Sequence, residues 1–159
     1  MVFLKHGKYE LPDRLLYDSA QYLFLDAAMK TVGIADVGYY FHGIPDRIEI
    51  LQLKSLIMGQ PFAILHSGNK KVPLTAPCSG NVVVINPEAM KFWEFDTYQR
   101  GYLVKLDHIT ETSPTLIGGR EIDNWARMLE RAIMPDRFTF KIVLVRDHES
   151  GKSMLRPIS

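Results

Sequence analysis

Apolar and polar residues alternate in short runs through the middle of the chain, and this period of two is typical of half-buried β-strands. The three clearest runs are PFAILHS (61–67), KKVPLTAP (70–77) and NVVVINP (81–87). Gly68 and Asn69 separate the first two runs, and Ser79 and Gly80 separate the last two, so each pair is expected to be joined by a two-residue turn. Strands joined this closely are antiparallel, which predicts a β-sandwich or a small barrel.

The N-terminal part of the chain carries weaker patterns. Residues 1–20 are mixed and predict an arm with one turn of helix after Pro12 and Asp13. Residues 21–34 predict a hairpin that turns between Asp26 and Lys30. A short helix is expected over residues 35–43, followed by a strand at 48–50.

The C-terminal part combines a strand with the best helix of the chain. GYLVKL (101–106) predicts a strand, and residues 121–134 predict a helix that Pro135 ends. Apolar residues on one face of that helix are Ile122, Trp125, Leu129 and Ile133. FTFKIVLV (138–145) predicts an added strand, and HESGKS (148–153) a turn.

The whole pattern predicts a mainly β (α+β) fold in one domain, because 159 residues suit a single core and no low-complexity linker interrupts them. We expect an N-terminal arm over residues 1–20 and a β core over 21–106. A helix and the added strand follow over 107–159. The added strand lies beyond the core pattern, so the helix and strand are expected to flank the core.

Composition and charge narrow the partner class. Apolar residues make up 47% of the chain and charged residues 23%, which is typical of a folded globular protein. The formal net charge of +1 does not favour nucleic acid or an acidic membrane surface, so a small-molecule or protein partner is expected. No apolar run is long enough to span a membrane, and the opening residues are too charged for a signal peptide, which predicts a cytoplasmic protein.

Catalytic and metal-binding patterns do not stand out. The five histidines are scattered, and no pair has the i, i+2 or i, i+4 spacing that places two imidazoles on one metal. The single cysteine, Cys78, lies in APCSG, where it is expected to fill space in a turn rather than to attack a substrate. We therefore predict no catalytic residues and no metal site. The tip of the 61–77 hairpin is the feature that remains, because Lys70 and Lys71 stand there as either solvated charges or reachable amines.

Five segments resemble the glycine cleavage system H proteins, in the same order. VGIADVGYYFHG (32–43) resembles VGITDYAQEQLG of that family, and GIPDRIEI (43–50) resembles GDIVFVEL. GQPFAILHS (59–67) is similar to GEPFAVVES, and LTAPCSGNVVVIN (74–86) to LYAPVSGEVVEVN. Tyr98 with GYLVKL is similar to PY followed by GWLLKI. The resemblance implies the barrel-sandwich hybrid fold of lipoyl and biotinyl domains, with flanking helices.

This resemblance implies a carrier instead of an enzyme. Members of the family hold a lipoyl group on one lysine at a hairpin tip, in the motif ESVKA, seven residues before the alanine of YAPVSG. Counting back from Ala76, and forward from Gly59, both lead to Asn69. The attachment-equivalent position therefore holds an asparagine here, and the tip that leads to it is His66, Ser67 and Gly68.

Two alternatives follow for the hairpin. If it turns at Gly68 and Asn69, Lys70 is a strand residue and lipoylation is lost; the chain is then a protein-binding or scaffold module without a cofactor. If the turn slips by one residue, Lys70 takes the tip, and lipoate on Lys70 or Lys71 would make the chain a carrier in glycine cleavage or a related one-carbon or sulfur pathway. The slip reverses the faces of the following strand, which disfavours it. The expected partners are proteins, including glycine cleavage or lipoylation enzymes.

Overall fold

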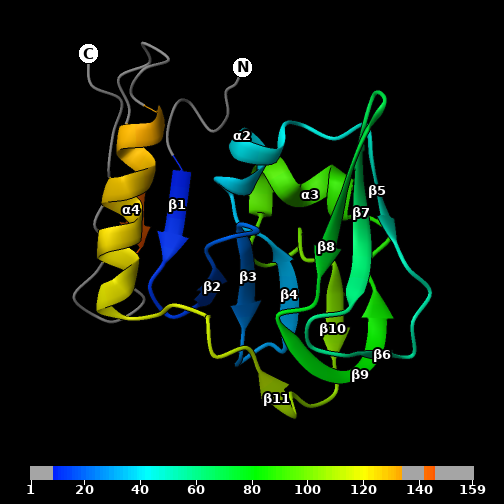
Figure 1. Cartoon of the computed structure of the whole chain (residues 1–159). Coiled ribbons are helices and arrows are strands. Elements are labelled where there is room, and N and C mark those ends of the chain that lie inside the picture. The colour runs from blue at the N-terminus through cyan, green and yellow to red at the C-terminus, as the bar shows by residue number, and fades with distance from the viewer. Residues whose placement is uncertain (1–8, 134–141, 146–159) are drawn as a thin grey trace.

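Strands dominate the computed structural model of the chain, which describes residues 9–133 and 142–145 (Figure 1). The helices are α2 (Gly38–His42), α3 (Ala89–Asp96) and α4 (Arg120–Ile133). In the first half of the chain the strands are β1 (Tyr9–Pro12), β2 (Leu16–Asp18), β3 (Leu23–Asp26), β4 (Thr31–Ile34), β5 (Arg47–Ile50), β6 (Ser55–Leu56) and β7 (Pro61–Ser67). The remaining strands are β8 (Lys70–Thr75), β9 (Cys78–Ile85), β10 (Val104–Leu106), β11 (Glu111–Thr112) and β12 (Ile142–Val145).

Three sheets result from the pairing of these strands. The largest has the order β11-β9-β10-β4-β3-β2, with β6 on the side of β9, and its β-ladders are antiparallel. A second sheet has the order β5-β7-β8, and its β7–β8 hairpin extends beyond the neighbouring strands in Figure 1. β1 and β12 form a small parallel sheet beside α4, so residues from both ends of the described chain lie together.

One hydrophobic core joins the large sheet to the other elements. Its largest fully buried side chains include Tyr9 from β1, Tyr17 from β2, Phe24 from β3, Tyr39 from α2 and Phe62 from β7. Burial of such aromatic side chains, at about 25 cal/mol per Å² of apolar surface, is the main force that holds the sheets together.

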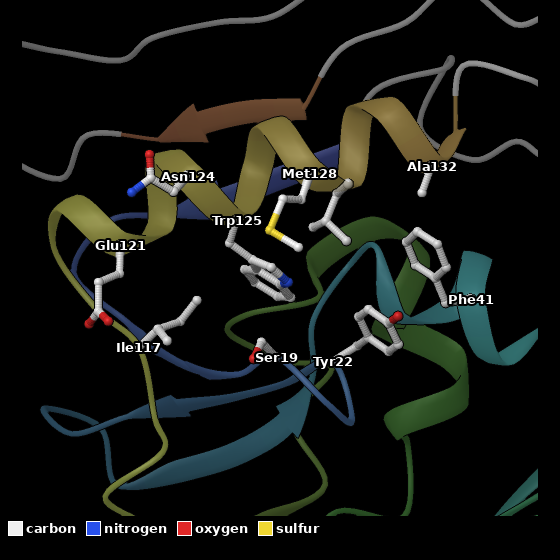
Figure 2. A pocket seen from close by; sticks show the side chains of 10 residues that line it. Ser19, Tyr22, Phe41, Ile117, Glu121, Asn124, Trp125, Met128 and Ala132 are labelled. Atoms are coloured by element: carbon white, nitrogen blue, oxygen red, sulfur yellow. The ribbon is translucent and has the colours of Figure 1, made fainter.

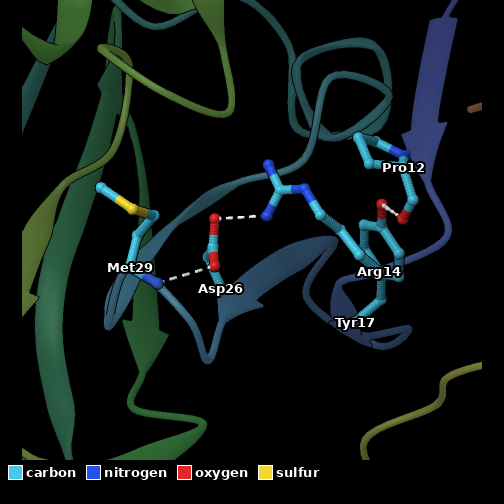
Figure 3. Close-up of polar contacts among 5 residues, drawn as sticks. All are labelled: Pro12, Arg14, Tyr17, Asp26 and Met29. Carbon is cyan, nitrogen blue, oxygen red and sulfur yellow. Dashed lines mark hydrogen bonds and ion pairs between the residues drawn. The ribbon is translucent and has the colours of Figure 1, made fainter. Parts of the chain in front are cut away.

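The N-terminal region differs from the arm with a helical turn that its sequence predicts. Residues 9–12 and 16–18 are strands, and the hydroxyl of Tyr17 donates a hydrogen bond of 2.7 Å to the carbonyl of Pro12 (Figure 3). Arg14 is paired with the buried carboxylate of Asp26 at 2.5 Å, and Asp26 also accepts the amide of Met29 at 3.0 Å. The helical prediction was wrong because these cross-strand contacts outweigh a weak local preference.

A turn predicted at Ser79 and Gly80 is also wrong, because both residues lie inside β9. Ser79 pairs with Glu111 of β11, and Gly80 pairs with Leu56 of β6. Gly80 is required for a close approach and not for a turn: a Cβ there would lie 2.2 Å from the carbonyl oxygen of His108. Cys78 is accordingly a buried strand residue and not part of a turn.

The aromatic segment 92–98, where the sequence patterns predict no helix, mostly belongs to helix α3. Trp93 and Tyr98 are buried, and Trp93 stacks on Tyr39 of α2 with ring centroids 4.0 Å apart. The helix ends where Gly101 packs against the backbone of Trp93 and Thr97, which leaves no space for a side chain. Trp93 and Tyr98 therefore attach this segment to the core, whereas Phe95 is 78% exposed.

Several predicted elements are confirmed. The hairpin over 21–34 is β3–β4, the short helix over 35–43 is α2, and the strand at 48–50 is β5. The helix over 121–134 is α4, which buries Ile122, Trp125 and Leu129 of its predicted stripe. β12 is the second half of the predicted FTFKIVLV strand; its first half and the HESGKS turn lie outside the described residues. None of the helices in the described ranges is long and apolar enough to cross a membrane.

Candidate functional site: the β7–β8 hairpin

The tip of the β7–β8 hairpin is a two-residue turn. Ser67 pairs with Lys70 and His66 with Lys71, which leaves Gly68 and Asn69 as the turn residues. Gly68 has a φ of 59°, whereas Asn69 is not among the residues with positive φ. A glycine with positive φ at the first turn position is the arrangement of type II′ hairpin turns, whose twist matches that of the flanking strands. Gly68, Asn69 and both lysines are exposed.

The segment before β5 holds this tip from the side. A carboxylate oxygen of Asp46 accepts the amide of Gly68 at 2.6 Å, while the amide of Asp46 donates to the carbonyl of His66 at 2.6 Å. The hydroxyl of Ser67 adds a longer hydrogen bond of 3.4 Å to the carbonyl of Ile44. These contacts fix the turn at Gly68 and Asn69.

Asp46 was not among the predicted site residues. It lies 22 residues from Gly68 in sequence, and no periodic pattern signals a contact over that separation. The base of the hairpin has a similar clamp in Gln21, whose side-chain amide donates to the carbonyl of Thr75 at 3.1 Å and accepts the amide of Thr75 at 2.7 Å. Asp18 orients this clamp by accepting a hydrogen bond of 2.7 Å from the Gln21 side chain.

The outer face of the hairpin carries a small charged cluster. Side chains of a strand alternate between its faces, and His66 and Lys71, which pair directly, share the outer one. His66 Nε2 lies 2.9 Å from a carboxylate oxygen of Glu49 on β5, and Arg47 lies 3.9 Å from the same oxygen. The hydrogen bond from His66 lowers the pKa of Glu49, and the positive charges of Arg47 and Lys71 act in the same direction.

The other face of the hairpin points toward the core, where Leu65 and Leu74 are buried. Lys70 lies at the outer end of this face, and its charge contributes to lowering the pKa of His42 in α2. Burial is the largest cause of that shift, and the hydrogen bond between His42 Nε2 and the carbonyl of Gln21, at 2.6 Å, acts in the opposite direction by raising the pKa. Lys70 and Lys71 therefore leave the hairpin on opposite faces.

Comparison with known proteins gives two curated relatives with related names. No family model matches the chain. A probable glycine cleavage system H protein 2 from Sulfurisphaera tokodaii is 28% identical over 106 residues, which cover 61% of this chain and 72% of the relative. A protein of the same name from Saccharolobus solfataricus is 34% identical over 79 residues, or 47% of this chain and about half, 53%, of the relative.

A crystal structure of a glycine cleavage system H protein from Mycobacterium marinum has the same fold, with a TM-score of 0.61 and 22% identity. The match covers 74% of this chain and 98% of the other. The chain is a divergent relative of the glycine cleavage system H proteins. Its mainly β fold is the barrel-sandwich hybrid of that family, as the sequence resemblance implies. This kinship supports a module of the lipoyl-carrier type and not an enzyme.

The remaining candidate residues do not gather into a second centre in this H-protein relative. Within the described ranges, no three histidine, cysteine or acidic side chains are placed to hold a metal ion. His42 and His66 lie on opposite faces of the hairpin region, and His6 and His148 lie outside the described residues. Burial raises the pKa of Cys78 to about 11, which keeps its thiol protonated and unreactive at neutral pH.

Proposed function

We propose that this chain is a non-catalytic, H-protein-like binding module that has lost the lipoyl attachment point. The observation that carries the proposal is Asn69 at the turn of the β7–β8 hairpin, the position that the family resemblance gives to the attachment lysine. Forming a lipoyl amide requires a nucleophilic amine. The side chain of Asn69 offers only a carboxamide nitrogen, whose lone pair is delocalised into the carbonyl, so no such bond forms there.

The strand register argues against a slipped turn. Lys70 would reach the tip only if β8 moved by one residue, and such a shift reverses every side chain of the strand. Leu74, which is fully buried, would then face solvent, and Lys71 would face the core. The hydrogen bond between Asp46 and Gly68 would also be lost. Each of these changes costs free energy, so the turn stays at Gly68 and Asn69.

A protein partner is the role that this geometry supports best. The hairpin projects from the molecule and is held rigid by Asp46 at its tip and by Gln21 at its base. Rigid, exposed elements of this kind bind partners with a small loss of conformational entropy. Kinship with H proteins favours glycine cleavage or lipoylation enzymes as the partners. Failure of the tagged protein to recover any stable partner at low or high salt would contradict this part of the proposal.

The attachment site is tested by intact mass spectrometry of the whole chain, produced in a host supplied with lipoate and lipoate ligase. We expect an unmodified mass for the wild type and the addition of one lipoyl group in Asn69→Lys. Asn69 is exposed and has no positive φ, so a lysine there fits without strain. A glycine cleavage H protein in the same host controls for ligase activity. A lipoyl group on the wild-type chain would overturn the proposal.

A second candidate function is a lipoyl carrier that uses a displaced lysine. The exposed amines of Lys70 and Lys71, directly after the turn, favour it. Lipoate would then be the cofactor, and the pathway would be glycine cleavage or a related one-carbon or sulfur pathway. Lys70→Arg and Lys71→Arg test it separately: loss of a lipoyl group in one variant would identify the attachment residue, whereas an unmodified wild type excludes both.

A further inference from the structure

An open groove of about 450 Å³ runs along α4 (Figure 2). Three parts of the chain that are distant in sequence form it. The segment before β3 contributes Ser19 and Tyr22, α2 contributes Phe41, and α4 supplies the opposite wall. In Figure 2, Trp125 and Met128 point from α4 into the groove, toward Tyr22 and Phe41.

The floor of the groove is a row of aromatic rings in fixed positions. The Tyr22 and Phe41 rings stack with centroids 4.7 Å apart and an interplanar angle of 9°, and Tyr22 and Trp125 lie 6.3 Å apart at 19°. Tyr17 holds Trp125 from within the core, at 5.3 Å. Tyr22 itself has a φ of 59°, a conformation rarely adopted by a large side chain, and Gly38 of α2 packs closely against it.

The apolar lining of the groove is open to solvent. Met128 is 64% exposed, whereas Trp125 beside it is 6% exposed. A groove open along its length does not enclose a small molecule on most sides, as ligand pockets usually do. Tyrosine, tryptophan and methionine on a preformed surface are instead typical of the centre of a protein interface.

Polar groups lie at one end of the groove. Figure 2 shows the carboxylate of Glu121 there, beside Ile117, with Asn124 on the same turn of α4, whereas Ser19 lies below Trp125 in this view. Glu121 is exposed and has no ion pair with any residue in ranges 9–133 and 142–145. It is the single ionisable acid of the lining, so the groove combines an apolar trough with one negative end.

We propose that this groove docks a short segment of a protein partner, with an apolar side chain seated against Tyr22 and Met128 and a lysine or arginine on Glu121. Charge complementarity selects the basic residue, and the faces of the aromatic rings also favour a nearby cation. This interaction goes beyond the hairpin proposal and does not depend on whether the chain carries lipoate.

The proposal is tested with a library of random twelve-residue peptides displayed on phage and selected on the full chain. We expect enriched sequences to carry an apolar residue close to lysine or arginine. A synthetic copy of an enriched peptide should bind saturably and change the fluorescence of Trp125, which is read in a Trp93→Phe background so that one tryptophan reports.

Reversing the charge at position 121 then tests whether the peptide binds with its basic residue on Glu121. Glu121→Lys should weaken the peptide about tenfold, and replacing the basic residue of the peptide by glutamate should restore binding to that variant. Glu121→Gln gives a milder test in case the reversal disturbs folding, and Glu111→Lys, on exposed β11, is the matched control. Selection that yields no saturable binder, or binders without a basic residue that ignore Glu121, would overturn the proposal. Whether the chain is lipoylated does not change the expected binding of the peptide, so the two proposals can fail separately.

Discussion

The hydroxyl of Tyr98 connects three parts of the molecule, and its removal tests how the N-terminal strand is attached. It donates a hydrogen bond to the carbonyl of Glu10 in β1 and accepts the amide of Asp36, before α2, at 3.0 Å. Burial raises the pKa of Tyr98 well above its usual value, so the phenol stays neutral and keeps both roles. Tyr98→Phe removes both hydrogen bonds while retaining the ring, which packs on Phe24 at 5.0 Å.

The expected loss of stability follows from the burial of the two backbone groups that lose their partner. Loss of the Tyr98 acceptor leaves the fully buried amide of Asp36 with a cost of about 1–3 kcal/mol, and the half-buried carbonyl of Glu10 adds about 0.5–1.5 kcal/mol. We therefore expect Tyr98→Phe to lower the free energy of unfolding by about 1.5–4.5 kcal/mol, a large part of the stability of an ordinary domain.

Urea unfolding followed by circular dichroism measures this loss. With a slope m of about 2 kcal/mol/M, the midpoint should fall by about 1–2 M while m stays unchanged. Tyr102→Phe is the matched control, because Tyr102 is half-buried and its hydroxyl makes no hydrogen bond within the described part of the chain. The control should stay within about 0.5 kcal/mol of the wild type. A Tyr98→Phe variant as stable as that control would refute the bridging role.

Three further changes probe other parts of the fold. Gly80→Ala places a Cβ 2.2 Å from the carbonyl oxygen of His108, so thermal unfolding should show a loss of about 3 kcal/mol or more; a loss below about 1 kcal/mol would contradict the close approach. Arg14→Met removes the partner of the buried Asp26 carboxylate and should cost about 3 kcal/mol in urea unfolding, whereas an unchanged midpoint would show that the pair does not matter. Burial holds the pKa of His42 below its unfolded value of 6.5, so the unfolded chain binds the proton more readily. Stability should therefore fall as the pH drops below 6.5, and His42→Gln should reduce that slope; an identical slope would exclude His42 as its source.

The elements that could be predicted from the sequence are those that local patterns specify. The β3–β4 hairpin, the β7–β8 hairpin and α4 each carry a clear period of two or of 3.6 residues, and their positions agree with the prediction. The glycine at position 80 was misread because a local rule associates Ser-Gly with a turn, whereas the nearby carbonyl of His108 that requires a glycine lies far along the chain. Helix α3 was missed because its aromatic residues do not form a regular stripe.

The candidate site also has parts that the local sequence predicts and parts that it does not. The register of β7 with β8 and the turn at Gly68 and Asn69 depend on neighbouring residues, so the local sequence was sufficient to predict them. The hydrogen bond of Asp46 to the tip joins residues 22 positions apart, and that of Gln21 to the base joins residues 54 positions apart. A single sequence does not reveal contacts over such separations. The groove along α4 depends on contacts between distant segments in the same way, and it could not be anticipated.

The two lysines beside the turn are not equivalent substitutes for an amine at position 69. Lys70 leaves the hairpin on the face of His42, and Lys71 leaves it on the face of Glu49, so an arm on either would start from a side of the strand instead of its tip. A partner enzyme that approaches the tip would meet Asn69 first. Because that residue is exposed and is not among the residues with positive φ, we expect Asn69→Lys alone to present an amine at the tip of an otherwise unchanged hairpin.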